Sequence, residues 1–108
     1  MSDFKEIFKE LGEEVADIAV KEFKDNSDLV INAMGDTFES SKKKMEEWMI
    51  AIASGNLKAE SLPTLVRGEI TLGKMEALKQ KGLSQAKLDK FVNNVIDKTI
   101  NKIIGSVL

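Results

Sequence analysis

The chain has 108 residues, a length that accommodates one domain around a single core. Hydrophobic residues make up 43% and charged residues 31%, which is typical of a folded globular protein and too apolar for a disordered one. Cysteine, histidine and tyrosine are absent. This composition excludes disulfides, thiolate nucleophiles, imidazole acid–base catalysis and the metal sites built from these residues.

The setting expected from the sequence is cytoplasmic. Nothing in a cysteine-free chain argues for an oxidising compartment. The N-terminal stretch becomes acidic from Asp3 onward and lacks the basic-then-apolar order of a signal peptide. No apolar run approaches the roughly 20 residues that a membrane-spanning helix needs.

Charge is distributed unevenly along the chain. Residues 1–39 hold eleven acidic residues and four lysines, a net charge of −7, whereas residues 40–108 hold twelve basic and seven acidic residues, a net charge of +5. We expect an acidic first helix to lie beside more basic later helices. The other interpretation, a basic face for acidic partners, is weakened by the interspersed acids and by the single arginine, Arg67.

Residues 4–23 are predicted to form the first amphipathic helix, capped by Ser2 or Asp3. Its apolar residues recur at steps of three and four: Phe4, Ile7, Phe8, Leu11, Val15, Ile18, Ala19 and Phe23. Glu22 falls inside this apolar stripe. We expect it to face solvent or a lysine at the edge of the stripe, and a buried functional carboxylate is the alternative.

Residues 29–54 are predicted to form the second helix, after a turn at Asn26–Asp28. Gly55 is expected to end it in the left-handed conformation, and Gly35 to bend its beginning. Three lysine–glutamate pairs at i,i+4 should support its exposed side. The apolar and small positions again follow steps of four and three: Met34, Phe38, Ser41, Met45, Trp48 and Ile52.

A third helix should begin with Ser61 as its cap and Pro63 in its first turn. A glycine inside a helix costs about 1 kcal/mol relative to alanine, so a break near Gly68 into two short helices is the alternative. Gly73 falls on the apolar face and favours close approach of a neighbouring helix. Gly82 and Ser84 then indicate a stop and a new start, and so short a linker makes the third and fourth helices antiparallel neighbours.

The last helix is predicted from about Gln85 toward Gly105. Its apolar stripe covers about half of the circumference, which suits either a helix packed between two neighbours or one lying on a membrane surface. The polar half carries few lysines and one acidic residue, so the core interpretation is favoured. The stripe comprises Leu88, Phe91, Val92, Val95, Ile96, Thr99, Ile100, Ile103 and Val107.

These patterns predict a single all-α domain over residues 1–108. Its expected architecture is an antiparallel bundle of four amphipathic helices, or of five if the third helix breaks at Gly68.

No catalytic, cofactor-binding or metal-binding residues are predicted, and we expect the protein not to be an enzyme. The adjacent pairs Glu13–Glu14 and Glu46–Glu47 point about 100° apart on a helix and cannot share a site. A pI near 5.2 and a low aromatic content argue against nucleic-acid binding.

The candidate interaction face lies on the second helix and consists of Met34, Phe38, Met45, Trp48 and Met49. Methionine-rich apolar faces adapt to partners, although the same residues can fill the core of the monomer. We therefore predict a small non-catalytic protein that acts through contact with a protein partner, or with itself as a homodimer. The alternative is a peripheral membrane-active protein that uses the C-terminal helix.

Overall fold

The computed structural model describes residues 4–78 and 83–107, apart from the side chains at 73 and 76–78. The described residues form only helices, so the all-α prediction is confirmed. The α-helices are α1 (Phe4–Phe23), α2 (Ser27–Ala53), α3 (Leu62–Leu78) and α4 (Gln85–Val107). Two 3₁₀ turns, Lys24–Asn26 and Ala59–Ser61, precede α2 and α3.

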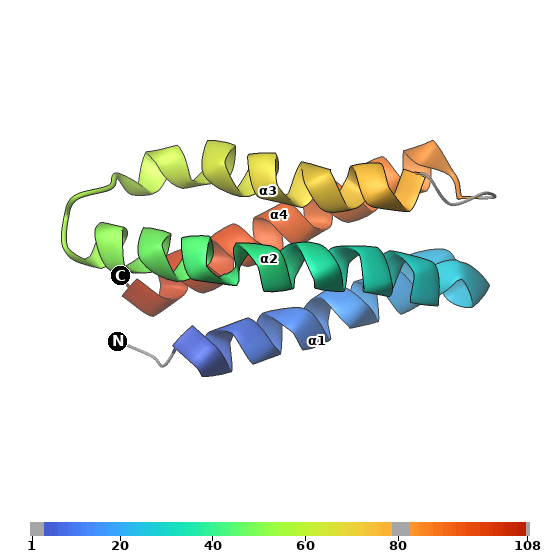
Figure 1. Cartoon of the computed structure of the whole chain (residues 1–108), viewed down its shortest axis with the longest axis horizontal. Coiled ribbons are helices and arrows are strands. Elements are labelled where there is room, and N and C mark those ends of the chain that lie inside the picture. The colour runs from blue at the N-terminus through green and yellow to red at the C-terminus, as the bar shows by residue number, and fades with distance from the viewer. Residues whose placement is uncertain (1–3, 79–82, 108) are drawn as a thin grey trace.

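The helices lie along a common long axis, and each runs opposite to the one before it (Figure 1). α1 packs on α2 and α4, and α3 packs on the same two helices. Each helix therefore has two principal neighbours and turns its apolar stripe inward between them. The long dimension of the molecule is 44 Å, close to the roughly 40 Å expected for the 27 residues of α2.

The core draws on every α-helix, because each contributes residues from its predicted apolar stripe. The fully buried side chains of largest volume are Phe91, Met34, Met45, Met49, Leu62, Ile70, Leu88 and Ile96. Phe23 of α1 and Phe91 of α4 meet edge to face, with ring centroids 5.6 Å apart and planes at 79°. This pair joins the end of α1 to the beginning of α4.

The connection between α1 and α2 is tighter than predicted. α2 begins at Ser27 rather than near Leu29, directly after the 3₁₀ turn, and Lys24 takes the positive φ of 48° that reverses the chain. Asn26 occupies the N-cap position, but its side chain makes no capping hydrogen bond. Ser27 is buried, so packing fixes the helix start where residue preferences alone suggested a later one.

The end of α2 follows the prediction. Gly55 has φ +83°, the left-handed conformation that costs glycine little. The Gly55 N–H donates to the Ile52 carbonyl at 3.1 Å, and the Asn56 N–H donates to the Ala51 carbonyl at 2.8 Å. These bonds satisfy carbonyls that a helix end would otherwise leave unpaired.

α3 is continuous through Gly68, so the alternative with two short helices is wrong. Pro63 is the second residue of α3, where its missing N–H interrupts no helical hydrogen bond. Gly68 is exposed and has ordinary helical φ. The free-energy cost of a glycine inside the helix is outweighed by the burial of its neighbours Val66 and Ile70. The predictions for Gly82 and for the caps Ser2 and Asp3 lie outside the described residues, and the prediction for Gly73 falls on a position at which only the backbone is described.

α4 begins as predicted and ends two residues later, at Val107. Ser84 accepts hydrogen bonds from the first turn: the Lys87 N–H donates to its Oγ at 3.4 Å, and the Leu88 N–H donates to its carbonyl at 3.0 Å. Seven of the nine residues of the apolar stripe are buried, and Ile100 and Val107 are partly buried. In this structure the C-terminal helix is therefore part of the core.

The two glycines Gly68 and Gly55 give opposite expectations for replacement by alanine. At Gly68 no neighbouring atom lies within 4 Å of where a Cβ would stand, so Gly68→Ala should raise the free energy of unfolding by about 0.5–1 kcal/mol. At Gly55 the positive φ should make Gly55→Ala destabilising by a similar amount. Urea denaturation measures both, and a lower stability for Gly68→Ala would contradict the continuous α3.

Candidate functional site

The predicted interaction face lies mostly inside the molecule. Met34, Met45 and Met49 are fully buried, and only 6% of the Phe38 surface is exposed to solvent. Trp48 is half-buried and packs against the core. Four of these five side chains therefore offer almost no surface to a partner in this conformation. The helical spacing placed them correctly on one face of α2, but it could not tell whether α1, α3 and α4 would cover that face.

A groove of about 650 Å³ lies instead between α1 and α2, on the outer surface. Its apolar lining combines Phe8, Val15 and Ala16 of α1 with Ile31 and Phe38 of α2. On each helix the groove spans eleven residue steps, a length of about 16 Å. Phe38 is the one member of the predicted face that contributes to this surface.

Aromatic rings form one half of the groove. The Phe8 ring meets Phe38 edge to face at a centroid distance of 5.9 Å, and it also contacts Phe4 at 5.6 Å. The ammonium group of Lys42 lies over the Phe8 ring, 5.5 Å from its centroid. This cation–π contact holds a positive charge at the groove edge without removing it from solvent.

The other half of the groove is shaped by two glycines, Gly12 on α1 and Gly35 on α2. No neighbouring atom lies within 4 Å of a Cβ position at either glycine, so both leave open space that a side chain would occupy. Charged lining residues are confined to the aromatic half: Lys5, Glu6, Lys9, Glu39 and Lys42. The groove thus has a charged end and an uncharged end. The sequence analysis missed the groove. Gly12 and Gly35 leave the apolar spacing of their helices intact, so nothing in the sequence indicated a concave surface there.

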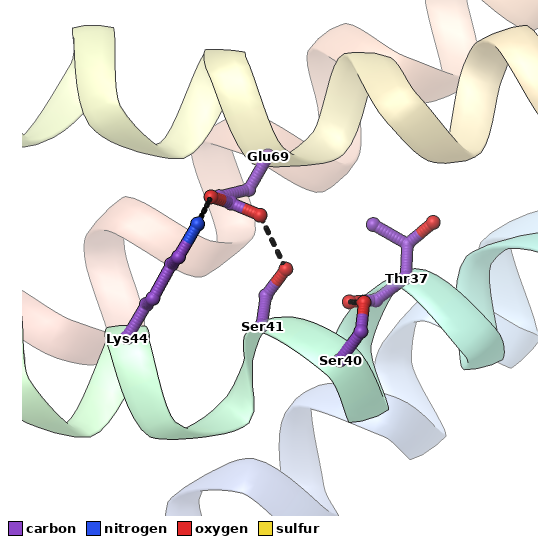
Figure 2. A network of polar contacts seen from close by, with 5 residues as sticks. All are labelled: Thr37, Ser40, Ser41, Lys44 and Glu69. Carbon is purple, nitrogen blue, oxygen red and sulfur yellow. Dashed lines mark hydrogen bonds and ion pairs between the residues drawn. The ribbon is translucent and has the colours of Figure 1, made fainter.

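A polar contact on the opposite side of α2 fixes this helix against α3 (Figure 2). The hydroxyl of Ser41 donates to Glu69 Oε2 at 2.6 Å, and Lys44 Nζ donates to Glu69 Oε1 at 2.9 Å. Both hydrogen bonds lower the pKa of Glu69 below its usual value, and the one from Ser41 has the larger effect. A carboxylate with a lowered pKa is a poor proton acceptor at neutral pH, so we assign this contact to helix positioning.

Acidic α1 lies beside the lysines of α4, in agreement with the expected charge distribution. Lys102 Nζ lies 2.9 Å from Glu10 Oε2 and 3.4 Å from Glu14 Oε1. The hydrogen bond to Glu10, aided by the charge of Glu14, raises the pKa of Lys102. Glu22 lies 3.9 Å from Lys90 Nζ and is partly exposed, so the expectation that it faces solvent or a lysine is confirmed.

The described residues contain no group of three or more acidic side chains positioned to hold a metal ion. Within the same residues, no helix has both the length and the hydropathy needed to cross a membrane. Comparison of the chain with protein-family models, curated proteins and solved structures finds no significant match.

Replacing Met49 by aspartate should unfold the protein. The side chain is 1% exposed, and burying an unpaired carboxylate there should cost about 3 kcal/mol or more. Ile50 is the matched control, because it is 52% exposed and Ile50→Asp should change the stability by less than about 1 kcal/mol. Thermal unfolding followed by circular dichroism distinguishes the two. A folded Met49→Asp variant would show that this face of α2 is not core.

Ser41→Ala should lower the stability by about 1.5 kcal/mol at pH 7, because Glu69 loses a hydrogen bond to its charged form. The pKa of Glu69 is lower in the folded state than in the unfolded state, so this stabilisation is present above the usual glutamate pKa and is lost as the pH falls through the lowered one. The difference between wild type and variant should therefore shrink in acid.

Ser40→Ala is the control for that measurement, since the Ser40 hydroxyl donates only to the Thr37 carbonyl within α2. Urea titrations of the three proteins at several pH values between neutral and acidic conditions supply the comparison. A Ser41→Ala penalty that is the same at every pH would contradict the role given to Glu69.

Proposed function

We propose that this protein is a non-catalytic antiparallel bundle of four helices that acts in the cytoplasm through protein–protein contact. Its contact site in this proposal is the α1–α2 groove, which receives an amphipathic helix of the partner. The observation that carries the proposal is the groove itself, an apolar surface open to solvent between two helices that are held in place from the other side.

The dimensions of the groove favour a helix as its occupant. A length of about 16 Å corresponds to three helical turns, which present apolar residues at i, i+3 or i+4, and i+7. Gly12 and Gly35 leave room for a backbone to approach closely, while the partly exposed side chains of Phe8 and Ile31 provide apolar contact area. Charged side chains at one end would border the occupant rather than lie beneath it.

The alternative, a membrane-active α4, requires this helix to leave the core. Seven of its side chains are buried: Leu88, Phe91, Val92, Val95, Ile96, Thr99 and Ile103. Exposing a buried aliphatic or phenylalanine side chain costs about 1.5–3 kcal/mol, so the release of α4 would unfold the domain unless a membrane replaced every contact. The groove needs no such rearrangement, and we therefore favour it.

The proposal is tested with a displayed library of helical peptides of about four turns. Peptides are selected on the wild-type protein, with Gly35→Leu as the groove-filled variant and Gly68→Leu as the matched control, because Gly68 is an exposed helical glycine away from the groove. Selected peptides should show apolar residues at i, i+3 or i+4, and i+7. They should bind wild type and Gly68→Leu alike and Gly35→Leu at least tenfold more weakly.

Two results would contradict the proposal. Peptides that bind all three proteins equally would place the contact outside the groove. Oleate binding that Gly35→Leu abolishes, without any selected peptide, would make the groove a site for a single-chain lipid instead.

A further inference from the structure

We propose that the helix received by the groove is α1 of a second copy of this chain, so that two copies pack with their α1 helices antiparallel. This inference rests on the proposed function and names its partner. It starts from the charges on α1: Lys5, Glu6 and Lys9 line the groove in the first half, where Glu10 is held by Lys102, and the exposed acids Glu13 and Asp17 lie in the second half. Two such helices attract each other when they run in opposite directions.

The register follows from the smallest residues on the groove side of α1. Gly12 and Ala16 both line the groove and are one turn apart, so backbones can approach most closely there. If the two α1 helices cross at Gly12, Lys9 of one copy lies beside Glu13 of the other, and Lys5 lies near Asp17. Three other acids of α1 face α4 instead: Glu10 and Glu14 lie beside Lys102, and Glu22 lies beside Lys90.

Exposed apolar surface on α1 also finds a place in this arrangement. Val20 is 53% exposed and continues the line of Gly12 and Ala16 by one more turn. In the antiparallel pair it would extend toward the aromatic end of the other copy's groove, where Phe8 and Phe38 lie. The contact would therefore cover an otherwise solvated valine in each copy.

The symmetry of this contact accounts for a closed dimer. Each α1 is both a wall of its own groove and the occupant of the other, so the same surface is used twice and no further copy can add. Leu72 and Met75 are exposed apolar side chains as well, but they lie on α3. Insertion of α3 into the groove of another copy would use two different surfaces and would produce an open-ended assembly.

A charge-swap experiment tests the antiparallel register. Sedimentation velocity and native mass spectrometry should show a dimer for the wild type. Lys9→Glu and Glu13→Lys should each weaken dimerisation at least fivefold, because each places like charges together at two symmetric positions. An equimolar mixture of the two variants should form the heterodimer, and the double variant Lys9→Glu/Glu13→Lys should recover the homodimer. Leu72→Glu is the control on α3 and should dimerise as the wild type does.

The outcomes separate the inference from the proposed function. A wild type that stays monomeric at millimolar concentration overturns the inference, while a peptide that binds wild type and not Gly35→Leu would still support the groove as a contact site. A dimer that is insensitive to Gly35→Leu but lost in Leu72→Glu would show that the copies meet through α3. Single variants that dissociate without rescue in the mixture would exclude the antiparallel register.

Discussion

Burial of the wide apolar stripe of α4 is the constraint on which the rest of the structure depends. This helix lies between α1 and α3, and Leu88, Phe91 and Val95 are fully buried there. Each side chain of this kind contributes about 1.5–3 kcal/mol when it is removed from water, so α4 binds the first and third helices into one core. The Phe23–Phe91 contact and the Lys102 ion pairs then determine how α1 lies on α4.

Because α1 and α2 turn their buried faces toward α3 and α4, the outer side of the α1–α2 pair stays open. α2 is held from the α3 side by the Ser41–Glu69 hydrogen bond and by its buried methionines, so its other side is free to form a wall. α1 is held by α4 in the same way. The groove is therefore a consequence of two helices that are each anchored from the other side and that carry Gly12 and Gly35 on their groove side. If the groove keeps this shape in solution, the helix that we propose as its occupant would bind with little reorganisation.

The sequence predicted the helices well because their apolar spacing is regular and their ends carry strong signals, such as Gly55 and Ser84. It misplaced the start of α2, where burial of Ser27 overrode the preferences of Asn26 and Asp28. The sequence did not decide whether the third helix breaks at Gly68, because helix propensity does not include the packing of Val66 and Ile70. The candidate site could not be predicted from the sequence. The same helical spacing is expected for a methionine face in the core and for one on a contact surface. A groove, in turn, depends on how two helices lie beside each other in space.

Native-state hydrogen exchange of the α4 backbone amides tests the central claim most directly, since it reports whether this helix opens separately from the rest of the core. The account predicts that Val95, Ile96 and Ile103 exchange only with the free energy of global unfolding, as the amides of Met45 and Val66 do. It also predicts that anionic liposomes leave these rates unchanged. Exchange of the α4 amides at a lower free energy than those of α2 and α3, or faster exchange when liposomes are added, would contradict the account.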